Sequence, residues 1–182
     1  MRGRLFAVVG PSGAGKDTLL AGVCGGTGPH WVRRVITRPS AAGGEPFEGV
    51  DAVEFDRREA EGAFALTWRA HGLAYGIPAA ELAPLEAGRD VVFNGSRAAL
   101  EQAAAAFPAL QVIVVTAPVA VLATRLAGRG RESAAQIAER LARDVAPLPP
   151  HLPVIEIVND TTPAAGIARL KAALQPSLAR RS

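Results

Sequence analysis

The sequence predicts a three-layer α/β fold, in which helices cover both faces of a mostly parallel β-sheet. Short apolar runs rich in β-branched residues alternate with Ala-, Leu- and Arg-rich stretches of helical length. Runs such as residues 112–115 are apolar on both faces, as a buried parallel strand requires. A glycine-rich turn joins the first apolar run to the first helical stretch. These observations favour a single domain over residues 1–182.

Each element is placed from its periodicity and from the breaks beside it. In chain order we predict strand 5–9, helix 16–23, strand 31–36, helix 52–61, strand 64–68, helix 79–86, strand 91–93, helix 98–106, strand 112–115, helices 119–127 and 134–145, strand 154–158 and helix 163–174. Glycine and proline predict a loop over residues 39–49 and a break over residues 147–153. The end of the chain, 179–182, is expected to fray.

Composition excludes several classes of protein. Hydrophobic residues make up 49% of the 182 residues and charged residues 20%, which is typical of a globular and not of a disordered chain. The first apolar run is too short for a membrane span or a signal peptide, and charges or Pro/Gly breaks interrupt the longer ones. Cys24 is the single cysteine, which fits a reducing compartment. We therefore expect a cytoplasmic protein without a membrane partner, either a monomer or a homodimer.

The basic residues indicate a phosphate-rich small molecule as the partner. The net charge is +3, no run of basic residues exceeds two, and aromatic residues are only 5% of the chain. A surface of interleaved basic and aromatic side chains, as nucleic acid requires, is not predicted. Of the 20 basic residues only Lys16 and Lys171 are lysines. Codon usage is one explanation of this bias; in the other interpretation, a lysine retained in such a chain indicates a position that needs a compact point charge.

The turn after the first strand has the pattern of a P-loop, which binds the phosphates of a nucleotide. It consists of Gly10, Pro11, Ser12, Gly13, Ala14, Gly15, Lys16, Asp17 and Thr18. The three glycines allow backbone shapes in which successive N–H groups point inward around an anion. The helix that follows adds unpaired N–H donors and the positive end of its dipole. Lys16 is expected to reach the β- and γ-phosphates of ATP and to act in catalysis.

One position departs from the general P-loop pattern. The residue after the lysine is usually Ser or Thr, whose hydroxyl binds Mg²⁺, but here Asp17 takes that place and Thr18 follows. In one interpretation Asp17 binds Mg²⁺ directly or through water, because carboxylates are good Mg²⁺ ligands. In the other, Asp17 is only a carboxylate that the helix dipole favours. Asp17 and Thr18 are both candidates for the metal site.

A cluster of arginines near residues 125–145 predicts a lid over ATP. Arg125 and Arg129 lie four residues apart and share a helix face, while Gly128 and Gly130 form a hinge around Arg129. Arginines that close over ATP supply the charge stabilisation that phosphoryl transfer needs. We therefore predict that Arg125 binds ATP and that Arg129 is catalytic. The alternative is a solvated helix hairpin held by surface ion pairs.

The ordered series of motifs resembles the guanylate kinase family over nearly the whole chain. The matching pieces are residues 10–18, 35–39, 44–45, 64–68, 71–77, 125–130 and 159–160. The resemblance implies a P-loop kinase fold with a helical lid and an acceptor-binding segment over about residues 37–90. It also implies that Asn159 lies in the loop on the adenine side of ATP. The alternative for Asn159 is an Asx turn before the last helix.

Departures from that family argue against guanine as the group that the acceptor site recognises. Thr67 stands where the resemblance leads us to expect an acid that reads the guanine edge, and Asn94 stands at a second acidic position. Ile77 takes the place of a hydroxyl residue, and Val53 that of a tyrosine. A pocket that hydrogen-bonds a base discriminates strongly only when those polar groups are present. Guanine recognition is therefore expected to fail.

A narrower resemblance accounts for Asp17. Asp17 after the lysine, together with residues 35–39, 43–44, 71–78 and 93–97, is similar to the ribose 1,5-bisphosphate phosphokinase family. That resemblance implies transfer of the γ-phosphoryl group of ATP to ribose 1,5-bisphosphate, giving 5-phosphoribosyl 1-diphosphate and ADP in bacterial phosphonate catabolism. The alternatives are guanylate kinase or another nucleoside monophosphate kinase, and a non-catalytic binding module with the same fold.

The acceptor group in this reaction is a sugar phosphate, so charge neutralisation matters more than a general base. Arg38 is the third predicted catalytic residue, because an arginine fork matches a phosphate with two parallel bonds. Asn94 and Ser96 follow a strand at its carboxyl end, where α/β sheets bind ligands, and are expected to hold sugar hydroxyls. The predicted acceptor contacts are Arg38, Tyr75, Asn94, Ser96 and Arg97. Simple surface positions for the two arginines, and packing at the rim for Tyr75, are the alternatives.

Overall fold

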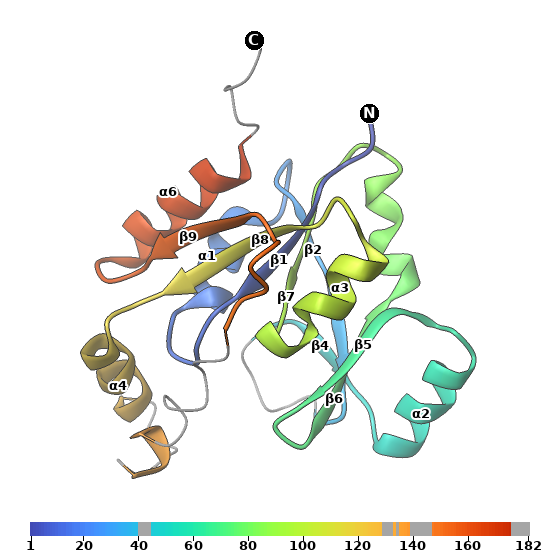
Figure 1. Cartoon of the computed structure of the whole chain (residues 1–182), viewed down its shortest axis with the longest axis horizontal. Helices are drawn as coiled ribbons and strands as arrows, with labels where there is room; N and C mark the ends of the chain where they lie inside the picture. The colour runs from blue at the N-terminus through green and yellow to red at the C-terminus, as the bar shows by residue number, and fades with distance from the viewer. Residues whose placement is uncertain (40–44, 129–132, 134, 139–146, 176–182) are drawn as a thin grey trace.

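The structure is a computed structural model that describes residues 1–39, 45–128, 133, 135–138 and 147–175 (Figure 1). Its main sheet has five strands in the order β2-β7-β1-β8-β9. All neighbouring strands in this sheet are parallel. The strands are β1 (Leu5–Val9), β2 (His30–Trp31), β7 (Val91–Asn94), β8 (Gln111–Thr116) and β9 (Val154–Val158). The predicted parallel sheet is confirmed.

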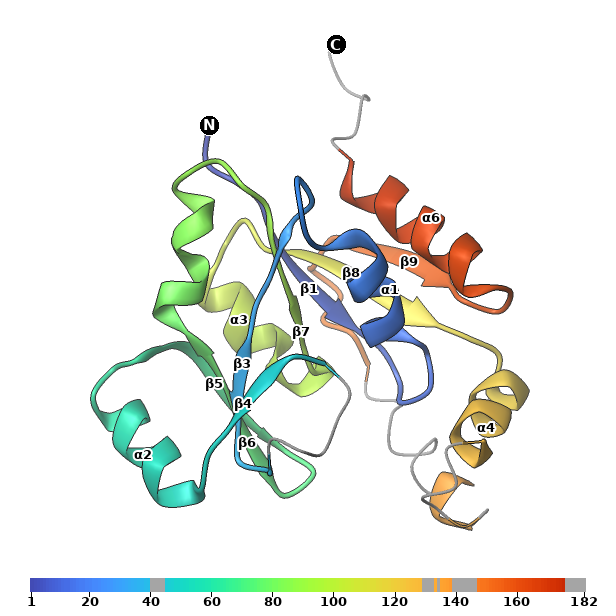
Figure 2. The same ribbon diagram turned by 180° about the vertical axis from the view of Figure 1, so that it is seen from behind.

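Helices pack on both faces of the main sheet (Figures 1 and 2). One core cluster joins Leu100 and Ala103 of α3 (Leu100–Ala106) to side chains of β1, β7 and β8. The other joins α1 (Lys16–Val23), α4 (Val119–Ala127) and α6 (Pro163–Leu174) to the opposite face of the sheet. Successive residues of β1 therefore alternate between two buried clusters, which explains why this strand is apolar throughout. The three predicted layers are confirmed.

A second sheet of four strands stands beside the main one, in the order β4-β3-β6-β5. Its strands are β3 (Arg34–Ile36), β4 (Phe47–Gly49), β5 (Phe64–Ala70) and β6 (Leu73–Pro78). β3 is parallel to β4 and antiparallel to β6, and β5 and β6 form an antiparallel hairpin. Helix α2 (Ala52–Ala60) connects β4 to β5, and two 3₁₀ segments, η2 (Ala79–Leu85) and η3 (Arg97–Ala99), flank β7. Residues of this second sheet line a cleft whose other side is formed by the P-loop, residues 10–18.

The single strand predicted at residues 31–36 is wrong, because the chain passes from one sheet to the other within it. β2 pairs with β7 in the main sheet, and β3 pairs with β4 and β6 in the second. Between them, the Val32 N–H donates to the Val92 carbonyl at 2.9 Å. The Arg33 N–H turns instead to the Glu81 carboxylate, also at 2.9 Å.

Two further predictions around the second sheet are wrong, and one of its strands was not predicted. The loop predicted over residues 39–49 contains β4, and β6 was not predicted at all. β6 follows β5 through a two-residue turn in which His71 and Gly72 have φ values of 53° and 74°, as a tight hairpin requires. The helix predicted at residues 79–86 is a 3₁₀ segment that contains Pro84, which lacks the N–H that an α-helix needs.

The predicted lid lies mostly outside the described residues. Residues 135–138 are helical, within the helix predicted at 134–145, whereas 129–132, 134 and 139–146 fall outside the description. Arg129 is among the latter.

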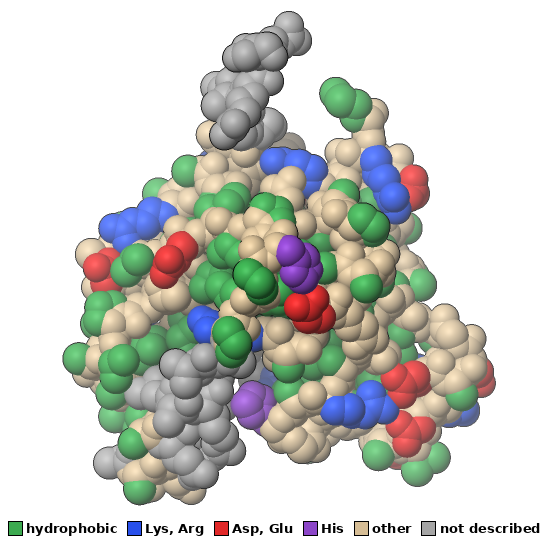
Figure 3. Space-filling model, in the orientation of Figure 1, with side chains coloured by type: hydrophobic (Ala, Val, Ile, Leu, Met, Phe, Trp, Pro, Cys, Tyr) green, Lys and Arg blue, Asp and Glu red, His purple; other side chains and the backbone are tan. Residues whose placement is uncertain are grey.

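No helix in the described part of the chain is long and apolar enough to cross a membrane. On the face shown in Figure 3, basic and acidic side chains are interspersed, and hydrophobic ones surface over β9, where Ile155 is 39% exposed.

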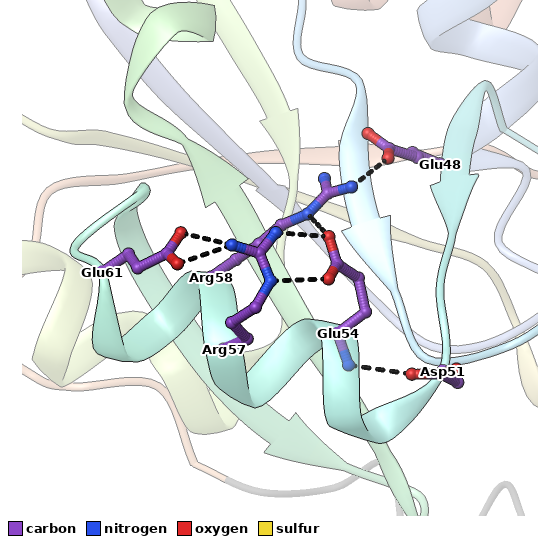
Figure 4. Close-up of polar contacts among 6 residues, drawn as sticks. All are labelled: Glu48, Asp51, Glu54, Arg57, Arg58 and Glu61. Atoms are coloured by element: carbon purple, nitrogen blue, oxygen red, sulfur yellow. Dashed lines mark hydrogen bonds and ion pairs between the residues drawn. The ribbon is translucent and has the colours of Figure 1, made fainter.

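Helix α2 carries a set of ion pairs that ties it to β4 (Figure 4). The Asp51 carboxylate accepts the Glu54 N–H at 2.8 Å and so caps the helix. The Glu54 carboxylate accepts from Arg57 at 2.8 and 2.9 Å and from Arg58 at 2.6 Å. Arg58 also donates to Glu48 of β4 at 2.8 Å. Hydrogen bonds from Arg57 and then Arg58 lower the pKa of Glu54 to about 2.

We expect Glu54 to stabilise the folded chain at neutral pH and to lose that effect in acid. Folding lowers its pKa, so its contribution is full above the unfolded value and disappears as the pH falls through the folded value near 2. Urea unfolding of wild type and Glu54→Gln at pH 7 and at pH 2 measures this. The loss in the free energy of unfolding caused by Glu54→Gln should be small at pH 7, because the ion pairs of Glu54 with Arg57 and Arg58 lie near the surface. The loss should be smaller still at pH 2.

The control for this experiment is Glu86→Gln, which removes an exposed ion pair between Arg2 and Glu86, the residue that follows η2. It should leave the unfolding midpoint almost unchanged. A Glu54→Gln difference of the same size at both pH values would contradict the assigned role of the carboxylate.

Candidate active site

The turn between β1 and α1 forms one wall of a cleft of about 560 Å³. Gly13 and Gly15 have φ values of 86° and 89°, in the left-handed region that other residues rarely adopt. Gly15 is also the N-cap of α1, and no side chain in the described residues caps this helix. A helix start of this kind presents N–H donors and the positive end of the dipole, which together suit a phosphate.

Lys16 lies back across the turn that precedes it. Its Nζ donates to the carbonyl oxygens of Gly10 at 2.6 Å and Pro11 at 3.1 Å. Lys16 also lines the cleft, so these bonds hold its ammonium group beside the loop. The structure thus places a compact positive charge next to the uncapped start of α1.

Asp17 and Thr18 line the same cleft. Asn94, the last residue of β7, donates from Nδ2 to Asp17 Oδ1 at 2.9 Å. This contact follows from the register of the main sheet, in which Asn94 lies opposite Val8 and therefore reaches the P-loop. The Asn94 amide holds the Asp17 carboxylate at the cleft.

The Asp17 carboxylate and the Thr18 hydroxyl fit Mg²⁺, which prefers oxygen ligands. In nucleotide sites this ion takes one or two protein oxygens and fills the rest of its shell with phosphate oxygens and water. The described residues contain no group of three or more His, Cys, Asp and Glu that could hold a metal alone. The donor set therefore suits a cation that is shared with a bound polyphosphate.

Two predicted ATP ligands, Asn159 and Arg125, contact the P-loop backbone instead of lining the described cleft. Asn159 is 4% exposed, and its Nδ2 donates to the Ala14 carbonyl at 2.8 Å. Arg125 donates from Nη1 to the Gly13 carbonyl at 3.3 Å. Both side chains thus hold the loop in shape, and their direct contact with ATP stays a prediction.

The opposite wall consists of aromatic and basic side chains from the second sheet. Trp68 of β5 and Tyr75 of β6 are paired in register and stack with ring centroids 5.3 Å apart and an angle of 4°. The Arg34 guanidinium of β3 lies 5.0 Å from the Tyr75 ring centroid and 5.6 Å from that of Trp68. Glu45 forms a buried ion pair with Arg34, through Nε at 2.9 Å and through Nη2.

The structure brings together most of the predicted acceptor contacts. Tyr75, Asn94, Ser96 and Arg97 all line the cleft. Ser96 also caps η3, since its Oγ accepts the Ala98 N–H at 3.3 Å. Arg38 is not among the described residues that line the cleft, and its guanidinium lies 4.2 Å from the ring centroid of Phe47. A role for Arg38 stays a prediction, as does that of Arg129, which lies outside the described residues.

Sequence reasoning missed much of the wall that the second sheet forms. The cleft-lining residues not predicted as site residues are Arg34, Trp68, Arg69, Ala70, His71, Gly95 and Ala98. The available signal was Arg34 itself, a charged residue inside an apolar strand run, where a buried arginine requires a partner. Because β6 was not predicted, no neighbouring strand could be placed beside Arg34 from the sequence, and Arg34 was therefore not assigned to the site.

Comparison with known proteins gives both a family and a fold. No protein-family model matches the chain. The chain is 53% identical, over 92% of its length, to ribose 1,5-bisphosphate phosphokinase PhnN of Acidiphilium cryptum and covers 91% of that protein. It is 52% identical, over 76% of its length, to the protein of that name from Agrobacterium fabrum and covers 78% of it.

Some relatives are bifunctional proteins that are much longer than this chain. The chain is 51% identical, over 95% of its length, to the bifunctional ribose 1,5-bisphosphokinase-thymidine phosphorylase of Cupriavidus necator. It spans 29% of that protein, and 26% of the Azorhizobium caulinodans protein of the same name. The chain thus matches less than a third of the length of these bifunctional relatives.

Solved structures show the fold alone. A guanylate kinase from Anaplasma phagocytophilum superimposes with a TM-score of 0.68 at 18% identity, over 95% of this chain and 85% of that one. A sugar kinase from Janibacter sp. HTCC2649 superimposes with a TM-score of 0.53 at 20% identity, over 98% and 99% of the two chains. The predicted P-loop kinase fold is confirmed.

Proposed function

The chain belongs to the ribose 1,5-bisphosphate phosphokinase family, and from this premise we propose that it transfers the γ-phosphoryl group of ATP to ribose 1,5-bisphosphate. The products are 5-phosphoribosyl 1-diphosphate and ADP, as a step of phosphonate degradation. The observation that carries the proposal is one cleft in which a phosphate loop faces a wall of arginine and aromatic side chains. That arrangement suits a phosphorylated acceptor opposite a nucleotide polyphosphate.

The reaction joins two phosphate groups. An oxygen of the acceptor's 1-phosphate attacks the γ-phosphorus of ATP, and the bond from that phosphorus to the β,γ-bridging oxygen breaks. The electron pair of the broken bond leaves on ADP. A phosphate oxygen is already anionic near neutral pH, because the second phosphate pKa is about 6. No general base is therefore needed, and the protein has to align the two groups and neutralise their charge.

Residues around the P-loop supply that neutralisation. The N–H groups of the loop and the start of α1 bind the polyphosphate, and the Lys16 ammonium balances charge at its β- and γ-phosphates. Asp17 and Thr18 would hold Mg²⁺, which neutralises phosphate charge when bound. Asn94 positions the Asp17 carboxylate through the 2.9 Å hydrogen bond. Arg129 is proposed to add a positive charge from the lid.

The main alternative, a guanylate kinase, finds less support in the cleft. At the two positions where an acid would read guanine, Thr67 donates to Glu59 at 2.5 Å and Asn94 donates to Asp17. Asp17 is the one acidic residue among the described residues that line the cleft, and it belongs to the P-loop. The N–H donors of a guanine edge would thus meet no carboxylate on the acceptor wall.

A competition between phosphorylated acceptors tests the proposal. The chain is incubated with ATP, Mg²⁺ and either ribose 1,5-bisphosphate or GMP, and the products are identified by mass. We expect 5-phosphoribosyl 1-diphosphate, with kcat/KM above that for GMP by about tenfold or more. An equal rate with GMP would overturn the acceptor assignment. Mg-ATP binding by calorimetry without transfer to any acceptor would favour a non-catalytic module.

A further inference from the structure

We propose that Arg34 binds the second phosphate of the acceptor, the one that is not phosphorylated, on the wall opposite the P-loop. This inference rests on the proposed function, since it assigns the 5-phosphate of ribose 1,5-bisphosphate to a named side chain. Arg34 is 6% exposed and yet lines the cleft. A buried arginine is uncommon and calls for groups that satisfy its charge and its donors.

Glu45 accepts hydrogen bonds from only two of the N–H groups of the Arg34 guanidinium. A guanidinium carries five N–H donors. Glu45 accepts one from Nε and one from Nη2, and the described residues provide no other hydrogen-bond acceptor for Arg34. Both N–H groups of Nη1 and one of Nη2 are left. One N–H of Nη1 and the remaining N–H of Nη2 lie parallel and form the edge of the fork away from Glu45. Phosphate oxygens bind such an edge through two parallel hydrogen bonds.

The surroundings fix the direction of this edge. The rings of Trp68 and Tyr75 stack on each other, and the Arg34 guanidinium lies within 5.6 Å of both ring centroids. Cation–π contact with these rings and the ion pair with Glu45 hold the side chain from two sides. A fork held in place before the ligand arrives loses little rotamer entropy on binding. Arg34 is therefore preorganised for a rigid anion.

Charge is distributed unevenly along the cleft. Arg34, Arg69 and Arg97 line it, whereas Asp17 at the P-loop is the only carboxylate among the described lining residues. Arg69 is already paired, with Glu59 at 2.7 Å and Asp56 at 3.3 Å. The acceptor wall thus turns guanidinium groups to the cleft, while the carboxylates that pair with Arg34 and Arg69 are not among its described lining residues. An acceptor with a phosphate at each end would place one at the P-loop and the other against Arg34.

Two variants separate ligand binding from a structural role of the Arg34–Glu45 pair. Arg34→Met/Glu45→Gln removes the fork without leaving a buried carboxylate unpaired, which would destabilise the fold. Arg34→Lys keeps the positive charge and the partner for Glu45 but loses the planar fork. If the double variant does not fold, Arg34→Lys alone still tests the proposal. Thermal unfolding verifies the fold of both variants.

The readout compares ribose 1,5-bisphosphate with ribose 1-phosphate, which has the reacting phosphate but lacks the second one. In both variants we expect kcat/KM for the bisphosphate to fall about 10- to 100-fold, as for loss of a charged hydrogen bond. The value for ribose 1-phosphate should stay within about threefold of wild type, because its reacting end does not touch Arg34. Arg58→Met, a paired arginine of α2 that is not among the described cleft-lining residues, is the control and should change neither value.

Three results would overturn the assignment of Arg34 as the site of the second phosphate. Equal losses for both acceptors would overturn the subsite and leave Arg34 a structural residue. A variant that keeps the wild-type preference for the bisphosphate would overturn it as well. Wild-type chain that fails to phosphorylate ribose 1,5-bisphosphate would refute the proposed function and the subsite together, and this result is seen before any variant is made.

Discussion

Replacing Lys16 by Met is expected to lower kcat for phosphoryl transfer about 10³-fold while the fold is kept. The ammonium group lies at the loop, beside the uncapped start of α1, where the γ-phosphoryl group would leave ADP. Met keeps the length and apolar stem of the side chain and removes only its charge. The fold should survive because Lys16 belongs to neither core cluster of the main sheet.

The other lysine of the chain provides the matched control. Lys171 is an exposed residue of α6 and is not among the described cleft-lining residues, so Lys171→Met removes the same charge outside the cleft lining and should leave kcat unchanged. Turnover is measured by coupling ADP formation to an optical assay, and far-ultraviolet circular dichroism verifies the fold. Wild-type turnover in folded Lys16→Met would exclude the P-loop as the catalytic centre.

Asp17→Asn is expected to lower kcat roughly 10²-fold and to raise the Mg²⁺ concentration needed for half-maximal rate. The substitution keeps the shape of the side chain and removes the charge that suits a divalent cation. If Asp17 served only as a helix-start carboxylate, the loss would be a small one in stability, with the rate unchanged. Titrating the rate with Mg²⁺ at saturating ATP distinguishes these two interpretations.

Asn94→Ala gives a graded comparison with Asp17→Asn. It removes the amide that orients the Asp17 carboxylate but leaves the carboxylate itself. Outer partners of metal ligands typically contribute 10- to 100-fold, so the same shift in Mg²⁺ dependence is expected at a smaller size. Identical Mg²⁺ titrations for wild type and Asp17→Asn would exclude Asp17 from the metal site.

Elements with a strong local pattern were predicted with their observed boundaries. The strands Leu5–Val9 and Val154–Val158 and the helices Lys16–Val23, Val119–Ala127 and Pro163–Leu174 are such elements. For the last helix the reason is visible in its start, where Thr162 caps the helix and Pro163 occupies its first position. Signals of this kind lie within a few residues of one another and do not depend on the rest of the fold.

Strand 64–68 of the second sheet was predicted and is β5 (Phe64–Ala70), but β4 and β6 could not be predicted in the same way. β4 has three residues and β6 contains Gly76 and Pro78, so neither has a strong strand pattern of its own. Each exists because neighbours pair with it: β3 with both, and β5 with β6. Strand pairing between distant segments supplies the hydrogen bonds that local propensity lacks. For the same reason the run at residues 31–36 could not be divided between two sheets from sequence.

By itself the sequence determined the strand, glycine turn and helix of the P-loop and so predicted its phosphate-binding chemistry, because loop, lysine and helix start are contiguous and their geometry is local. Only the tertiary structure decided what faces that loop. Arg34, Trp68 and Tyr75 come from three strands, and an arginine becomes a buried, oriented cleft residue only once Glu45 pairs with it and the two rings stack beside it. Burial and orientation of a charged side chain depend on partners brought from elsewhere in the chain, and these cannot be read from the residue's own neighbourhood.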